Sequence, residues 1–167
     1  MKISTLFPLL LLICFVFSGC QKNDRPADLP KLYPCRITVT QETVPLAGAS
    51  ITLQAVNGSG KYQVSSGRTD SAGIATIYTY GFVGVPLGDY KITISKVSTE
   101  GGTRQADSFG GGKVVGTKDY QLVDNKFTEN DTTPAKITIT EKSNDTSIDV
   151  GKAVHQMIPS MPVSPLM

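Results

Sequence analysis

The sequence predicts an all-β protein whose main part is a single seven-stranded Greek-key β-sandwich. Short stretches of alternating apolar and polar residues are separated by turn residues, and no stretch has the 3.6-residue apolar period of a helix. The chain has 167 residues, which is enough for one domain with one apolar core.

The first residues have the layout of a secretory signal. Lys2 gives a short positive start, and Leu6–Phe17 is almost continuously apolar but too short to span a bilayer comfortably. The small residues Ser18-Gly19 then precede Cys20. This order resembles the lipobox of bacterial lipoproteins, which implies that residues 1–19 are a signal peptide and that Cys20 carries a lipid. The alternative is an ordinary signal peptide that is cleaved elsewhere.

The segment 20–34 is predicted to be a tether between the lipid and the domain. It is polar and contains three prolines, which favour an extended chain. Acyl chains on Cys20 would attach the protein stably to a membrane of the cell envelope. Gln21 stands where lipoproteins retained at the inner membrane of Gram-negative bacteria carry Asp, so the resemblance favours the outer membrane.

The charge of the chain gives no indication of a nucleic-acid partner. The sequence has 16 basic and 14 acidic residues, and one basic residue, Lys2, belongs to the signal. The remaining charges are scattered rather than gathered in a basic stripe. We expect an envelope protein or a polysaccharide, besides the membrane itself, to be the partner.

Alternation places the strands of the sandwich within residues 35–151. The predicted strands cover residues 36–40, 49–55, 62–65, 74–79, 90–95, 135–140 and 146–150, with a candidate edge strand at 120–123. Asp70 and Gly73 are typical of a tight turn between two of them. The glycine-rich stretch 98–134 is predicted to be mobile. Residues 152–167, in which Pro159, Pro162 and Pro165 recur every three residues, are predicted to be a disordered tail.

Three segments of the predicted sandwich carry a family likeness. Pro45–Ile51, Gly67–Ala75 and Gly88–Ile94 resemble the carboxypeptidase-regulatory-like (transthyretin-like, immunoglobulin-like) β-sandwich. Over roughly residues 29–151 the chain is similar to small lipoproteins of planctomycete-type bacteria that contain this domain. The resemblance implies an accessory, non-catalytic module. The first hairpin departs from the pattern, because Gln41–Val44 replaces the usual Asp-Gly-Lys type of turn.

Chemistry-bearing residues are few, so the sequence indicates no enzyme, cofactor or metal site. The chain has one histidine, His155, and it lies in the predicted tail, where no scaffold would position it as a base. Cys35 is the one cysteine left beside Cys20 after signal cleavage, and its place at a strand start favours a buried, unreactive thiol. A redox or inter-chain role for Cys35 is the alternative.

One alternating set of aromatic residues offers a candidate ligand contact. Tyr78, Tyr80 and Phe82 could form one face on which a sugar ring stacks. The competing interpretation is strand packing by Tyr78 and a loop plug by Tyr80 and Phe82. We therefore expect a non-enzymatic, membrane-anchored envelope lipoprotein that acts as a binding or structural module, with a carbohydrate-binding module as the alternative.

Overall fold

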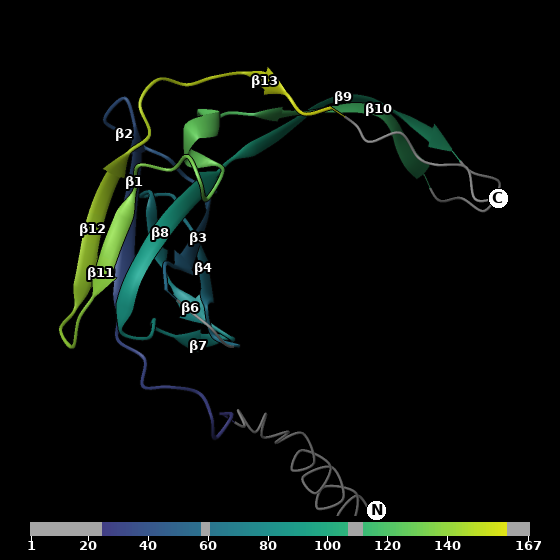
Figure 1. Ribbon diagram of the computed structural model, residues 1–167. Coiled ribbons are helices and arrows are strands. Elements are labelled where there is room, and N and C mark those ends of the chain that lie inside the picture. Colours follow the sequence, from purple (N-terminus) through teal and green to yellow (C-terminus); the bar gives the residue numbers. More distant parts are fainter. Residues whose placement is uncertain (1–24, 58–60, 107–111, 160–167) are drawn as a thin grey trace, which may run out of the picture.

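The computed structural model describes residues 25–57, 61–106 and 112–159, and the all-β sandwich predicted from the sequence is confirmed (Figure 1). The strands are more numerous than predicted, and their bounds differ from the predicted ones by a few residues. They are β1 (Cys35–Gln41), β2 (Val44–Pro45), β3 (Ser50–Ala55), β4 (Val64–Arg68), β5 (Ile74–Thr76), β6 (Tyr78–Thr79), β7 (Phe82–Val83), β8 (Gly88–Ser95), β9 (Val97–Ala106), β10 (Gly112–Gln121), β11 (Lys136–Ile139), β12 (Asn144–Asp149) and β13 (Gln156–Met157).

The sandwich has two sheets that enclose one core. In the first sheet, β1 pairs in parallel with β12 and antiparallel with β2 and β5. The second sheet has the order β11-β8-β3-β4-β6-β7. The fully buried side chains come from both sheets, and the largest are Ile37, Ile51, Leu53, Ile77, Ile92 and Ile94. The predicted alternation in β1, β3 and β8 therefore matches the inward face of each strand.

The stretch predicted as one strand at 74–79 changes sheet in its middle. β5 pairs with β1, whereas β6 pairs with β4 in the other sheet. Ile77 lies between the two short strands with no exposed surface. A strand that crosses between sheets closes this part of the sandwich, which explains why one predicted strand becomes two.

The turn before β5 is built as its residues predict. The Oδ1 atom of Asp70 accepts hydrogen bonds from the backbone N–H groups of Ala72 and Ile74, each at 2.9 Å. Gly73 has φ +74°, and a Cβ atom at this position would lie 2.6 Å from the carbonyl oxygen of Val39. This turn accordingly requires glycine both for its backbone conformation and for its close approach to β1.

The first hairpin is a tight two-residue turn rather than the Asp-Gly-Lys type. Glu42 and Thr43 have φ values of 50° and 69°, and Val44 pairs with Gln41 in the ladder. Asp149 holds the turn, because its Oδ2 atom accepts the N–H of Thr43 at 3.1 Å. Val44, a poor turn residue, thus lies in β2 and not in the turn.

The stretch predicted to be mobile contains the longest strands. β9 and β10 form an antiparallel ribbon that projects from the sandwich (Figure 1). Strand β8 ends at Ser95 and β9 begins at Val97, so the ribbon continues the second sheet outward. The glycine residues of this stretch hid the strand pattern in the sequence.

Part of the predicted disordered tail is also ordered. β13 pairs with the base of β10, and the N–H of Ile158 donates to the carbonyl oxygen of Asp119 at 2.8 Å. The ring of His155 stacks on that of Tyr120, with centroids 3.9 Å apart. The prediction of disorder is therefore wrong for residues 152–159, because the free edge of β10 provides a backbone partner. Residues 160–167 lie outside the described part.

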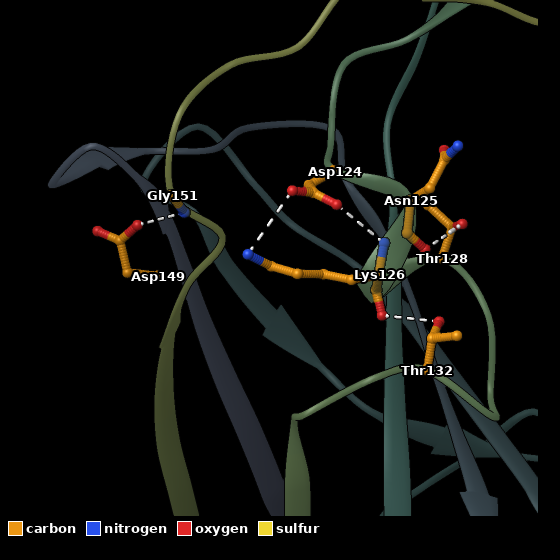
Figure 2. A network of polar contacts seen from close by, with 7 residues as sticks. All are labelled: Asp124, Asn125, Lys126, Thr128, Thr132, Asp149 and Gly151. Carbon is orange, nitrogen blue, oxygen red and sulfur yellow. Dashed lines mark hydrogen bonds and ion pairs between the residues drawn. The ribbon is translucent and has the colours of Figure 1, made fainter.

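A polar network folds the connection between the ribbon and β11 (Figure 2). Asp124 accepts the N–H of Lys126 at 3.0 Å and caps the 3₁₀ helix η2 (Asn125–Phe127). The Nζ atom of Lys126 lies 3.6 Å from Asp124, and Thr132 donates to the carbonyl oxygen of Lys126 at 3.1 Å. Because each contact is local, the network stabilises this loop.

Candidate functional site at the anchor end of the sandwich

The segment before β1 leads to one end of the sandwich, which we call the anchor end. The topology brings together here the N-terminal segment 25–34, residues 56–57 and 61–62, the β6–β7 turn at 80–81 and the loop 84–87. In Figure 1 this end lies at the bottom of the sandwich, where β6 and β7 are labelled, and the ribbon leaves from the opposite end. The two ends of the molecule therefore differ in what they can contact.

The inner part of the predicted tether is packed against the domain. Leu29 and Tyr33 are buried, and Tyr33 exchanges two backbone hydrogen bonds of 2.9 Å with Val85. Gly84 has φ +110°, and a Cβ atom there would lie 2.8 Å from the carbonyl oxygen of Tyr33. The prediction that 20–34 is a tether is therefore wrong for residues 29–33, because Leu29 and Tyr33 are buried against the domain.

A charged clamp holds the outer part of the same segment. Asp28 accepts a hydrogen bond from Tyr62 Oη at 2.8 Å and lies 3.2 Å from Lys61 Nζ. The hydrogen bond from Tyr62 and the nearby Lys61 ammonium lower the pKa of Asp28, and the same hydrogen bond raises the pKa of Tyr62. The segment is thus fixed to the chain around residue 61 as well as to the core.

The three aromatic residues proposed as a sugar-stacking face do not share a face. Tyr80 and Gly81 form a two-residue hairpin turn with φ values of 55° and 84°. Tyr78 pairs with Val83 and Thr79 with Phe82, so the side chains of Tyr78 and Phe82 lie on opposite faces of the hairpin. The period-two spacing fails here because the chain reverses at Tyr80.

The aromatic residues instead contact the N-terminal segment and its clamp. The Tyr80 ring meets the Tyr62 ring edge to face at 5.4 Å, and Tyr62 is the residue bonded to Asp28. The Arg25 guanidinium lies 6.0 Å from the centroid of the Phe82 ring. Tyr80 is still 67% exposed. These residues therefore fix where the N-terminal segment leaves the domain and still present an aromatic surface.

Cys35 and His155, the other residues considered for chemistry, lie in different surroundings. Cys35 is buried as predicted, and burial raises the pKa of its thiol to about 11, with a smaller contribution from the negative charge of Asp145. The Nε2 atom of His155 lies 2.9 Å from Glu100 Oε1 in the exposed ribbon. Within residues 25–57, 61–106 and 112–159, no three His, Cys, Asp or Glu residues are close enough to hold a metal ion. Cys20 lies outside these ranges.

One depression lies along strands β8 and β11. It encloses about 320 Å³ and is lined by Val56, Asp89, Tyr90, Lys136, Ile137 and Thr138. Its carboxylate, Asp89, accepts a hydrogen bond from Thr138 Oγ1 at 2.6 Å. Because Asp89 is engaged by a neighbour on the next strand, this depression offers a surface for contact rather than an acid–base pair.

Comparison with known proteins assigns no family to the chain. No family model matches the sequence, and no curated protein matches it. The structure is similar to that of a variant of BcpA, the major pilin subunit of Bacillus cereus, with a TM-score of 0.41 and 19% identity. The match covers 72% of this chain and 30% of the pilin chain. In the described part of the chain, no helix has the length and hydrophobicity to cross a membrane.

Proposed function

We propose that this protein is a non-enzymatic lipoprotein of the bacterial cell envelope that acts as a binding or structural module. Acyl chains on Cys20 would attach the protein to a membrane, and the outer membrane is favoured over the inner one. The observation that carries the proposal is that the two ends of the molecule differ. The N-terminal segment is docked at one end, and the ribbon projects from the other (Figure 1). The likeness to carboxypeptidase-regulatory-like accessory modules agrees with a non-catalytic role.

The ribbon is the part best suited to meet a partner away from the membrane. In the order β13-β10-β9, strand β9 has no neighbour on its outer side among the described residues. Its backbone groups there could pair with an extended segment of a partner protein. Thr99 and Thr117 are exposed on the ribbon, so contacts there would not require the sandwich to rearrange.

Site-specific cross-linking in native envelopes tests this role. A photoreactive residue at Thr117, in the ribbon, should give one dominant protein adduct, whereas the same residue at Ser66, exposed on the outer face of the sandwich, should not. Adducts from Ser66 alone would refute contact through the ribbon. Mass spectrometry of the adduct would name the partner.

The lipid on Cys20 has a separate test. Mass spectrometry of the mature N-terminal peptide should find acyl chains on Cys20, and Cys20→Ala should move the protein from the membrane fraction to the soluble fraction. The peptide that contains Cys35 is the internal control, because this buried thiol should stay unmodified. An unmodified Cys20 in membrane-bound protein would refute the lipid anchor.

A carbohydrate-binding module is the alternative, and the exposed Tyr78 and Tyr80 rings favour it. Replacing Tyr80 and Phe82 by alanine separates the two functions. Under the alternative, the wild type retains envelope polysaccharide, and the double variant loses it with little change in melting temperature. Under our proposal, neither protein retains polysaccharide, and the melting temperature falls because the contacts to Tyr62 and Arg25 are lost.

A further inference from the structure

We propose that the anchor end of the sandwich rests on the lipid–water interface of the membrane that holds the protein, with the β6–β7 hairpin as the contact. This inference depends on the proposed lipid anchor at Cys20. It adds that the domain has a fixed end toward the bilayer, so that the ribbon points away from it. Three features support it: the reach of the chain, the exposed side chains and the way the segment is held.

The chain between the anchor and the domain is short. Arg25 is the first described residue, and it lies five positions after Cys20 in the sequence. Five residues reach at most about 17 Å even when fully extended. Arg25 is itself placed on the Phe82 ring and donates to the carbonyl oxygen of Pro30 at 2.9 Å. A lipid on Cys20 would thus bring the hairpin close to the head groups.

The side chains at this end suit an interface. Six of the eleven large hydrophobic residues that are exposed in the described part lie on or beside it, namely Val56, Val64, Tyr78, Tyr80, Val83 and Leu87. Tyrosine is favoured where water meets lipid, because its ring is apolar and its hydroxyl is polar. Tyr80 is the most exposed of the six at 67% and occupies the tip of the hairpin.

Basic side chains accompany the apolar ones. Arg25 and Lys31 belong to the docked segment and lie over the rings of Phe82 and Tyr33, and Lys61 lies beside Asp28 of that segment. The acidic group within this segment, Asp28, is bonded to Tyr62 and Lys61. Long basic side chains can reach anionic head groups while their stems cover apolar surface. The combination favours a lipid surface as the occupant.

Tryptophan reporters test the orientation, because the chain has no tryptophan of its own. Full-length lipoprotein with Tyr80→Trp is reconstituted into phosphatidylethanolamine–phosphatidylglycerol vesicles that contain brominated acyl chains. Its emission should shift to the blue and lose intensity through bromine quenching. The matched variant Thr117→Trp, with its reporter on the exposed ribbon, should show neither change. Equal melting temperatures of the two variants confirm that both are folded.

The possible results separate this inference from the proposed function. An unquenched Tyr80→Trp on a protein that carries acylated Cys20 refutes the interface contact and leaves the anchor standing. Quenching of both reporters refutes the fixed orientation, because the ribbon would then also touch lipid. An unmodified Cys20 on a protein that washes off the vesicles refutes the anchor and, with it, this inference.

Discussion

The sandwich and the ribbon share one continuous stretch of chain but are stabilised in different ways. In β8, Tyr90, Ile92 and Ile94 are buried on one face. In β9, every residue from Val97 to Thr103 is at least partly exposed. A two-stranded ribbon without a buried face is marginal on its own. Burial of apolar side chains therefore stabilises the sandwich, whereas backbone pairing and contacts at the base stabilise the ribbon.

The largest expected difference comes from removing core volume. Ile92→Ala should lower the free energy of unfolding by about 2–5 kcal/mol, because Ile92 has no exposed surface and the cavity would not fill. Val97→Ala, where the side chain is 48% exposed, should change it by less than about 0.5 kcal/mol. Urea unfolding followed by circular dichroism measures both. Equal losses would show that the ribbon belongs to the same buried unit.

Two threonine hydroxyl groups sharpen the comparison, since each donates a hydrogen bond of 2.6 Å. Thr69 is buried, donates to the carbonyl oxygen of Leu46 and accepts the N–H of Ala49 at 2.7 Å. Thr99 donates to Asp119 on the exposed ribbon. Thr69→Val should lower the free energy of unfolding by about 1–3 kcal/mol, because it leaves buried backbone groups without a partner.

Thr99→Val is the matched control and should change the free energy of unfolding by less than about 0.5 kcal/mol, since water replaces the lost bond. Both variants are measured by urea unfolding. A loss for Thr99→Val as large as that for Thr69→Val would contradict the view that burial decides the cost.

The sandwich could be predicted because its residues carry local signals. Ile37 and Val39 alternate with polar residues and are both fully buried in β1. Asp70 and Gly73 form the turn that their residue types favour. Each signal lies within a few residues of the structure that it predicts, so sequence alone was sufficient.

The ordered tail and the aromatic end depend on contacts that are distant in sequence. β13 is ordered by pairing with β10, and His155 stacks on Tyr120. The spacing of the aromatic residues predicted one face, but Tyr80 takes a positive φ that a non-glycine residue rarely adopts, and the chain reverses there. The sequence has no local signal for the pairing of the tail with β10 or for the positive φ of Tyr80.

Removing the tail contact should affect the ribbon and spare the sandwich. His155→Ala loses the stack on Tyr120 and the contact with Glu100, both on an exposed surface, and should change global stability by less than about 1 kcal/mol. Hydrogen exchange at the N–H of Ile158, which bonds to Asp119, should become faster. Lys152→Ala, at another exposed tail position, is the control. Unchanged exchange at Ile158 would show that backbone pairing alone holds β13.

The smallest expected effect is a dependence on pH near the first hairpin. The backbone N–H of Gly151, at 2.6 Å, and next that of Thr43 hold the pKa of Asp149 below its ordinary value. This contribution to stability is therefore fully present above the ordinary carboxyl pKa of about 3.9 and is lost as the pH falls through the lower value of the folded state. In urea unfolding between neutral and acidic pH, the free energy of unfolding should fall less steeply for Asp149→Asn than for the wild type. Asp131→Asn, in an exposed loop, should follow the wild type. Parallel curves for all three proteins would mean that the hairpin turn is stable without the carboxylate.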